Sequence, residues 1–424
     1  MIKSLKSVFE VKHIRKKIIA TLLLILVYKI LSVIPVPGAN TNALSDIFKN
    51  WDNSWLWFFS ALMWGWLKRF SIILMGLSPY INAMIILQLL WVIVPKIGDL
   101  QKEWEQGQKI ITKWTRRLTL PLAFAQSYWM IILMNNLAWQ PIIDTNNFST
   151  VLEAMIVISA WTMFLVWLWE IITEYGIGNG ISIIITASVL SWVPWIIMSY
   201  IDKGDYPLFV WILIATLIII YVIIKFTEWN RRIPVIYTRT GREEKSYFPI
   251  RINQAWMVPI IFAVSLVTFP SILGQLLAKS TSANAQKIWE FMQTYLNMNS
   301  PSWYLIWFYF LLVVAFSFFY VSITFNTEQV AESIQKRWGY IPGIRPWAET
   351  ESYLRKVSNH LNLFGWSFLA LIAVLPYVIS LLRGWETTRF IISGAWLIII
   401  VSVILDLIRK VDTEVKMYDY SKFK

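Results

Sequence analysis

Residues 150–190, TVLEAMIVISAWTMFLVWLWEIITEYGIGNGISIIITASVL, contain two long apolar runs separated by a short glycine-rich break. Its first apolar run, 150–172, is long enough to cross the about 30 Å of hydrocarbon in a bilayer. A glycine-rich break follows at 176–180, and a second apolar run starts at Ile181. Glycine clusters between periodic segments mark turns. Two membrane spans joined by a short turn indicate a polytopic helical membrane protein.

The same pattern recurs along the chain. Of the 424 residues, 57% are hydrophobic and 15% charged, whereas a soluble domain carries about 25% charge. This balance excludes an ordinary soluble enzyme, a disordered chain and a fibrous repeat. We therefore expect an all-α membrane protein with ten spans, at 18–34, 70–94, 118–134, 150–172, 181–200, 208–224, 256–277, 303–325, 361–382 and 390–405.

The basic residues predict the orientation. Twenty-nine Lys and Arg fall on one side of the predicted spans and eight on the other. The Lys/Arg-rich side of a membrane protein faces the cytoplasm, so both termini are expected there. The net charge of +13 points to anionic lipid or RNA near the basic segments. Those segments are 1–17, 95–117, 225–254, 326–360 and 406–424.

Two loops on the basic side and one stretch on the other side are unusual. The loops 225–254 and 326–360 contain RRIPVIYTRTGREEK and YIPGIRPW. They are either solvated topology signals or a docking platform. On the opposite side, residues 51–69 are too short to span and too apolar for an ordinary loop. Such a stretch folds back into the membrane only where protein or water shields its backbone.

The residues for covalent chemistry are scarce. The chain has no cysteine and two histidines, His13 and His360, so a disulfide, a Cys-ligated zinc or a thiol nucleophile is excluded. Phosphate-loop, HExxH and GxSxG motifs do not occur. Glu153, Glu170 and Glu174 lie near the ends of one span, where solvated helix ends and a proton relay are both open interpretations. No cofactor, metal or enzymatic activity is expected.

Eight stretches stand in order over nearly the whole length of the chain, and several of them are long. They are IPVPG (34–38), GLSPYINAMIILQLL (76–90), KEWEQGQKI (102–110), TMFLVWLWEIITEYGIGNGIS (162–182), RRIPV (231–235), NQAWMVPIIFA (253–263), FNTEQVAESIQK (325–336) and YIPGIRP (340–346). Together they resemble the SecY family of protein-conducting channels. The resemblance implies ten helices in two five-span halves, 1–200 and 201–424, around a central pore. It also implies passage of unfolded polypeptides across the cytoplasmic (inner) membrane and release of membrane helices sideways into lipid.

The same resemblance assigns a pore ring of six aliphatic side chains. Large aliphatic side chains form a poorly wetted constriction that resists ions. Two pairs of the six stand at i,i+4 spacing, which places each pair on one helix face. Taken singly, each residue is more typical of a core or lipid-facing aliphatic, and only the alignment with the family assigns it to the pore. The six are Leu77, Ile81, Ile181, Ile185, Ile261 and Ile399.

The remaining assignments from the resemblance concern the gate, the plug and the docking loops. A re-entrant plug is expected at about 54–67, including Trp64 and Gly65. The spans at 70–94 and 256–277 match a lateral gate with the polar residues Asn82, Gln88 and Asn253, for which ordinary interhelical hydrogen bonding is the alternative. Docking of the ribosome, through its rRNA, or of the SecA motor is expected at Arg231, Arg232, Arg242 and Arg345.

The implied partners are the SecE and SecG subunits, SecA, the ribosome, anionic lipids, and secretory and membrane polypeptides. Two other functions compete with a channel. A secondary transporter with inverted repeats shares the broken helices and the two halves, but it needs a polar or charged site at mid-membrane. An intramembrane enzyme needs a nucleophile with its base, or a set of metal ligands. Neither requirement is met by the sequence.

Tryptophan is oddly frequent: the chain has 26 Trp and 16 Gly. By the resemblance, ten Trp stand where the family has Gly, and an aromatic belt at the lipid interface does not explain those in loops. We hypothesise that the source organism reads UGA codons as glycine, whereas the sequence was translated with UGA as tryptophan. The alternative is real tryptophan enrichment in a divergent or engineered channel. Under the first hypothesis, displaced rings or local distortion are expected. The ten are Trp64, Trp104, Trp129, Trp161, Trp169, Trp192, Trp229, Trp256, Trp338 and Trp347.

Overall fold

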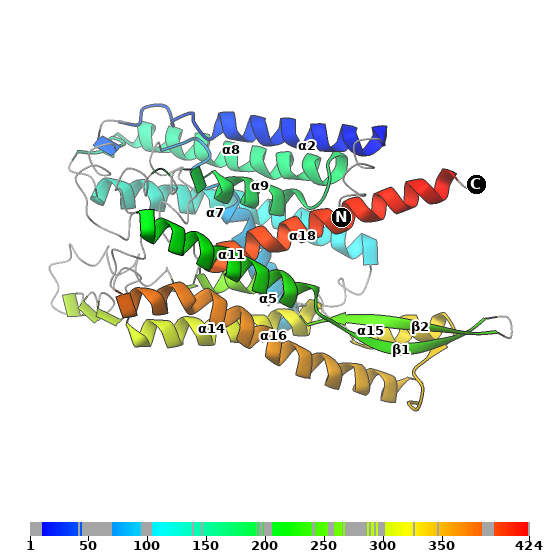
Figure 1. The fold of residues 1–424 in the computed structure, drawn as a ribbon. Coiled ribbons are helices and arrows are strands. Elements are labelled where there is room, and N and C mark those ends of the chain that lie inside the picture. Colours follow the sequence, from blue (N-terminus) through cyan, green and yellow to red (C-terminus); the bar gives the residue numbers. More distant parts are fainter. Residues whose placement is uncertain are drawn as a thin grey trace. The chain divides into compact units, whose positions relative to one another are not determined.

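The structure is a computed structural model and is mostly helical (Figure 1). It describes residues 11–40, 43–44, 70–94, 104–137, 140–145, 147–191, 193–194, 198, 206–239, 242–252, 258–264, 266–267, 286–287, 290–291, 294–295, 302–324, 327–345, 347–383 and 394–422. The expected plug at 54–67, with Trp64 and Gly65, lies outside these residues, as does Asn253.

The chain divides into two compact units. The first contains Met1–Trp195 and Asp406–Lys424, and the second contains Ile196–Leu405. The last helix, α18 (Gly394–Lys422), therefore contributes residues to both units. The expected halves, 1–200 and 201–424, stay a prediction, although the end of α18 belongs with the first unit.

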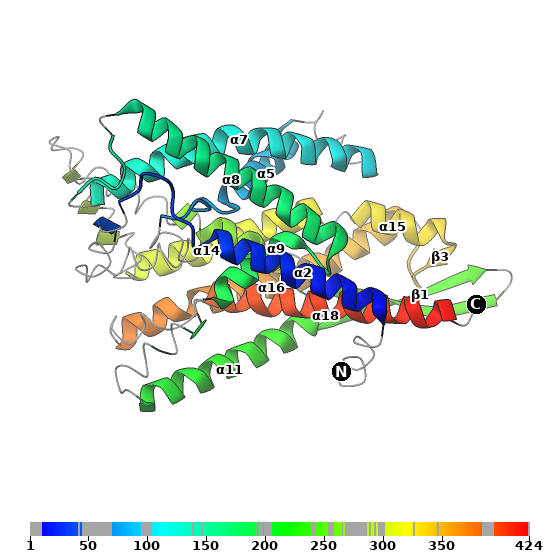
Figure 2. The ribbon, with the colours of Figure 1, turned by 90° about the horizontal axis from the view of Figure 1, so that it is seen from above.

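Unit 1 is a helical bundle, with helix α7 packed on α5 and α8, and with α8 packed on α2 and α9 (Figures 1 and 2). Two side-chain contacts join α2 to the C-terminal half of α9: Tyr28 with Ser188, and Lys29 with Ser191. The bounds are α2 Lys12–Leu31, α5 Ser78–Ile93, α7 Trp104–Leu137, α8 Phe148–Tyr175 and α9 Gly180–Leu190.

Helix α5 begins later than the span predicted at 70–94. Residues 72–77 form buried turns, and the helix starts at Ser78 with Pro79 in its first turn. Proline is favoured there because its missing N–H has no helical partner at that position. Leu77 is consequently the N-cap residue of α5 rather than a residue within it.

Three other helices extend more than ten residues beyond their predicted spans. Helix α7 begins at Trp104 instead of 118, α16 (Ala348–Arg383) begins ahead of 361, and α18 continues to Lys422 beyond 405. Glu349 and Glu351 occupy the first turn of α16, where negative charge favours a helix N-terminus. Hydropathy does not predict these polar extensions, because they lack the apolar composition that marks a span.

Unit 2 combines helices with a small sheet in the order β2-β1-β3. Strands β1 and β2 form an antiparallel hairpin, with Arg232 opposite Pro249, and β3 pairs with β1 through Ile236 and Tyr340. Helix α14 packs along α16. The bounds are α11 Tyr206–Glu228, β1 Asn230–Arg239, β2 Arg242–Arg251, α14 Trp303–Thr324, α15 Thr327–Lys336 and β3 Gly339–Tyr340.

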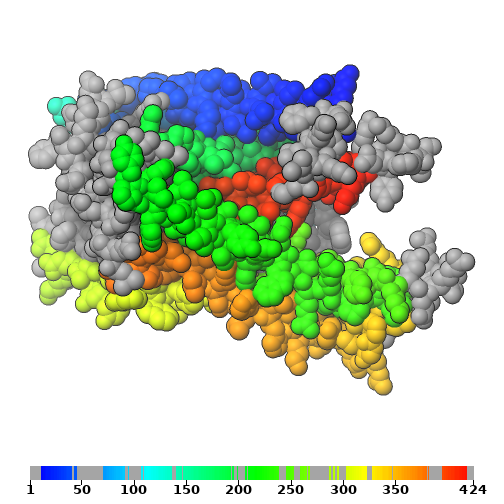
Figure 3. Space-filling view, in the orientation of Figure 1, coloured from blue at the N-terminus to red at the C-terminus, as the bar shows by residue number. Residues whose placement is uncertain are grey.

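The three strands, α15, the connecting residues 341–345 and residues 347–360, which include the start of α16, lie together at one end of unit 2, and we call them the hairpin module (Figures 1 and 3). Alternate residues of β1 point into its core, which fits the two-residue period of a strand. The two segments predicted as loops thus carry regular structure. The core consists of Ile233, Val235, Ile250, Ala331, Ile334, Ile341, Leu354 and Val357.

Five of the described helices are long and apolar enough to cross a membrane. Helices α5 and α9 are also apolar but are shorter. Within the predicted span 256–277, residues 258–264 are helical. The spanning segments are Lys109–Asn135, Phe148–Tyr175, Phe209–Glu228, Trp303–Val321 and Ala348–Ile379.

Candidate functional site

The six candidate pore residues all belong to the described part of the chain. Leu77, Ile81, Ile185 and Ile399 are buried, and Ile181 and Ile261 are half-buried. None of the six presents the largely exposed face expected of a lipid-facing aliphatic. Their convergence in one constriction stays a prediction.

Within unit 1, local structure explains the two i,i+4 pairs. The Ile81 N–H donates to the Leu77 carbonyl over 2.9 Å, so the two side chains stand one turn apart at the start of α5. Ile181 and Ile185 occupy the first turns of α9, where the Asn179 side chain accepts a hydrogen bond from the Ile181 N–H at 3.0 Å. Both pairs thus follow a turn that fixes where the helix begins.

Aliphatic character alone does not identify these residues. Helices α2 and α11 present exposed aliphatic side chains, among them Leu23, Leu26, Ile214 and Leu217. In a bilayer such residues face lipid at no cost. The distinction between pore candidates and lipid-facing residues therefore comes from burial in the fold and not from residue type.

The candidate gate residues are described in part. Asn82 and Gln88 are both half-buried on α5, the helix that packs on α7. Polar side chains on membrane helices contribute about 0.6 kcal/mol on average to helix association. A role in a lateral gate stays a prediction for both.

Exposed arginines lie on the hairpin module. Arg231 and Arg232 are exposed at the start of β1, and Arg345 is exposed between β3 and α16. Arg242 begins β2 opposite Arg239. Guanidinium groups suit both phosphate and carboxylate partners because their N–H groups form a fixed fork.

The main chain at Arg345 is tied to the start of α16. Its N–H donates to Glu349 Oε2 at 3.3 Å, and its carbonyl accepts from Thr350 Oγ1 at 2.9 Å. Both partners of the Arg345 main chain are thus side chains in the first turn of α16. They hold the backbone that presents the arginine while leaving its side chain in solvent.

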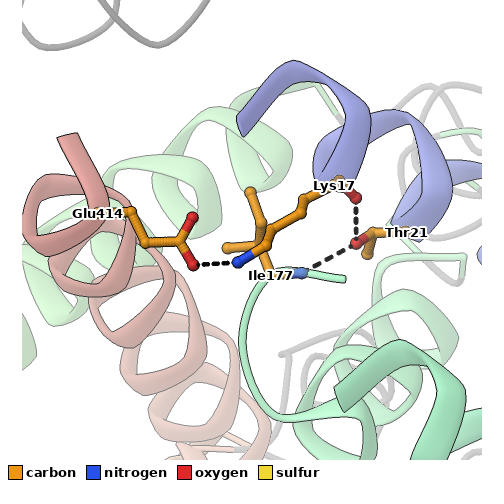
Figure 4. Close-up of polar contacts among 4 residues, drawn as sticks. All are labelled: Lys17, Thr21, Ile177 and Glu414. Atoms are coloured by element: carbon orange, nitrogen blue, oxygen red, sulfur yellow. Dashed lines mark hydrogen bonds and ion pairs between the residues drawn. The ribbon is translucent and has the colours of Figure 1, made fainter. Parts of the chain in front are cut away.

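A polar joint that the sequence does not predict surrounds the 176–180 turn (Figure 4). Thr21 of α2 accepts a hydrogen bond from the Ile177 N–H at 3.1 Å and donates to the Lys17 carbonyl at 2.9 Å. Lys17 in turn forms an ion pair with Glu414 of α18 at 2.6 Å. The turn, the first helix and the last helix described thus meet at one place in unit 1.

Hydrophobic packing encloses the same joint. Ile14, Ile177 and Val415 form a buried cluster with Val11, and Leu407 packs against it. The sequence contains no local signal for this contact, because Lys17 and Glu414 are 397 positions apart. A tertiary structure was needed to find it.

Glu170, for which a solvated helix end and a proton relay were both open, has a partner. Arg116 Nη2 of α7 lies 2.6 Å from Glu170 Oε1 of α8. The acid is less exposed than the arginine. The pair joins two packed helices, with Glu170 near the end of α8 and Arg116 well inside α7. An ion pair between neighbouring helices is a structural explanation for an acid on a membrane helix.

The described residues define a multi-pass, mostly helical membrane protein whose second unit carries the hairpin module. A family model described as SecY matches residues 71–408. Protein translocase subunit SecY of Thermotoga maritima is 37% identical over 442 aligned positions, covering 100% of this chain and 98% of that protein. The chain belongs to the SecY family.

Solved structures agree in fold. A SecY protein studied for the role of its plug domain in the closed translocation channel matches with a TM-score of 0.67 at 18% identity, over 94% of this chain and 92% of that one. Sec61 in the canine ribosome-channel complex matches with a TM-score of 0.65 at 18% identity and the same coverage. The ten-helix channel fold predicted from the sequence is confirmed.

Proposed function

We propose that this chain is a protein-conducting channel that moves unfolded polypeptides across the cytoplasmic membrane and releases membrane helices sideways into lipid. Its full-length similarity to protein translocase subunits supports the translocation function. The observation that supports the site is the burial of Ile81, Ile185 and Ile399 on apolar helices of a membrane protein, and of Leu77 at the N-cap of α5.

The chemistry of these side chains suits a channel for chains of any sequence. An aliphatic constriction holds water weakly and so resists ions while it is empty. Dispersion contacts are individually small and have no preferred direction, so the same side chains adapt to a polar or an apolar passenger. We propose no covalent chemistry in this chain, and the energy for transport comes from its partners.

Cross-linking of a stalled secretory chain tests the pore. The absence of cysteine gives a clean background for single substitutions Ile81→Cys and Ile185→Cys. Adducts are expected at both positions. Leu190→Cys on α9 and Leu217→Cys on α11, at exposed positions, are the matched controls and should give few.

Adducts at the control positions with none at 81 or 185 would refute the pore assignment. A secondary transporter would give no adducts at any of the four positions. Such a transporter needs a polar or charged site at mid-membrane, and among the described residues the fully buried polar side chains carry no charge.

The hairpin module is proposed as the docking surface for the ribosome or the SecA motor, with the Lys/Arg-rich side and both termini in the cytoplasm. The support is the exposure of Arg231, Arg232 and Arg345 on a folded platform. Similarity in fold to a channel bound to a ribosome agrees with this role. SecE and SecG complete the proposed complex, and anionic lipids meet the basic ends of the helices.

Binding of empty ribosomes to the chain in lipid discs tests the docking surface. Arg345→Glu is expected to weaken binding about tenfold at moderate salt, because it removes a phosphate contact and adds repulsion. Lys336→Glu, an equal charge reversal at an exposed residue of the same module, is the control and should cost less. Equal losses would indicate general attraction rather than a docking residue.

A further inference from the structure

Four of the ten tryptophans at expected glycine positions stand at the ends of described helices: Trp104 begins α7, Trp229 follows α11, Trp338 follows α15 and Trp347 precedes α16. Of these four, Trp338 and Trp347 have positive φ angles, 57° and 78°. Trp129, Trp161 and Trp169 lie inside helices, and Trp64, Trp192 and Trp256 lie outside the described residues. The helix ends at Trp338 and Trp347 are therefore the positions where backbone conformation distinguishes glycine from tryptophan.

Trp338 occupies a C-terminal cap position. Helix α15 ends at Lys336, and the Trp338 N–H donates to the Gln335 carbonyl at 2.8 Å. A left-handed residue that closes a helix by such a bond is usually glycine, because it has no Cβ to meet the carbonyl. A side chain as large as indole is among the least suited to this conformation.

Trp347 occupies an N-terminal cap position. Its carbonyl accepts the first bond of α16, from the Glu351 N–H at 3.0 Å. Ser, Thr, Asp, Asn and Gly are preferred at an N-cap. Of these, glycine best fits a φ of 78°. The C-terminal cap at position 338 and the N-terminal cap at position 347 thus both favour glycine.

The third non-glycine residue with positive φ among those described shows what normally stabilises such a conformation. Phe70 is 0% exposed, and its carbonyl accepts from the Val36 N–H at 2.9 Å. Burial of the aromatic ring offsets its backbone strain. Trp338 and Trp347 are 78% and 71% exposed, so their rings gain little from burial.

We propose that positions 338 and 347 are glycine positions, that the native polypeptide carries glycine at both, and that its host reads UGA codons as glycine. The excess of 26 Trp over 16 Gly is the composition that translation of such codons as tryptophan produces. In the native chain the two glycines bracket the segment that presents Arg345, and two exposed indole rings leave the hairpin module.

Mass spectrometry of peptides from the native host tests the decoding directly. Glycine is expected at 338 and 347, and tryptophan at Trp167, an exposed residue inside α8 that needs no glycine. Tryptophan at 338 or 347 in the native peptides, or UGG codons there in the gene, would overturn the decoding.

Thermal unfolding of the full chain tests the glycine positions independently of the gene. Trp338→Gly and Trp347→Gly are each compared with the matched alanine variant, which removes the ring but keeps a Cβ. Glycine should exceed alanine by about 1–3 °C in Tm at both positions.

Trp167→Gly is the control and should lower Tm relative to Trp167→Ala, because glycine weakens a helix interior. If the alanine variants at 338 and 347 have Tm values equal to or higher than those of the glycine variants, these are not glycine positions and the proposal fails.

Discussion

Two connections between helices of this chain both contain residues with positive φ angles, but they place different residue types at those positions. The α8–α9 turn, 176–179, is closed by hydrogen bonds: the Gly176 N–H donates to Ile172, and the Gly180 N–H donates to Thr173. It is also packed on α2. The α15–α16 connection, 337–347, has the same need for left-handed residues but carries exposed tryptophans near both ends.

The comparison distinguishes two reasons why a position needs glycine: close packing against a neighbouring backbone segment, and a backbone conformation that other residues rarely adopt. At the α8–α9 turn, a glycine is needed because another backbone segment occupies the space of a side chain. At the α15–α16 connection, space is open around Gly343 and the φ angle alone favours glycine. Substitutions at the two places should therefore differ in the size of their effects.

Gly180→Ala should be the most damaging change. A Cβ at this position would overlap the Trp169 carbonyl oxygen, which is backbone and is held within a helix. Overpacking of this kind costs about 3 kcal/mol of unfolding free energy. Thermal unfolding of the purified chain measures it, with Ser182→Ala in the same turn of α9 as the control. An unchanged Tm would show that α8 and α9 do not approach this closely.

Thr21→Val should cost about 2 kcal/mol, because it leaves the buried Ile177 N–H without its acceptor. Thr173→Val is the matched control: its hydroxyl also accepts from a backbone N–H, of Gly180, but this side chain is exposed and water can replace it. Tm and amide hydrogen exchange at Ile177 report the loss. Similar effects of both substitutions would mean that burial of the joint does not matter.

Gly343→Ala should cost about 1 kcal/mol, since its φ of 82° is unfavourable for alanine although an alanine Cβ would meet no atom within 4 Å. Gly343→Asn should lose less unfolding free energy than Gly343→Ala, because asparagine tolerates the left-handed region better than other residues except glycine. Chemical unfolding of the three chains gives the order. A larger loss with asparagine would point to a steric rather than a conformational cause.

The Lys17–Glu414 pair should give the smallest effect. Both side chains are about a quarter exposed, so a double-mutant cycle with Lys17→Met and Glu414→Gln should yield a coupling energy of about 0.5–1 kcal/mol. High salt should reduce this coupling. A coupling near zero at low salt would leave the apolar cluster as the main attachment of α18 to α2.

The accuracy of prediction from the sequence followed the strength of the physical constraint. A bilayer requires long apolar helices, so the positions of the spans were predictable from residues such as 150–172. The ends of the helices were not, because polar extensions such as 348–360 are stabilised by tertiary packing instead of lipid. The β1–β2 hairpin was not predicted for a related reason: the alternation around Ile233 and Val235 is short, and the basic residues beside it are typical of a loop.

The candidate site shows the same limit. The six pore candidates came from the resemblance to a family, since an isoleucine such as Ile185 cannot be distinguished by type from one that faces lipid. The joint of Thr21, Ile177 and Glu414 was not predictable at all, because its members are far apart in the chain. Arg116 as the partner of Glu170 was equally hidden, for the same reason.

Helix α16 has a mechanical consequence. It begins inside the hairpin module, where Leu354 and Val357 lie in the core, and it continues as a membrane span to Ile379. An unbroken α-helix rises 1.5 Å per residue and resists bending, and the first proline within it is Pro376. A partner that tilts the hairpin module should therefore also move the membrane-spanning part of α16. A force applied outside the bilayer would in this way reach the helices within it.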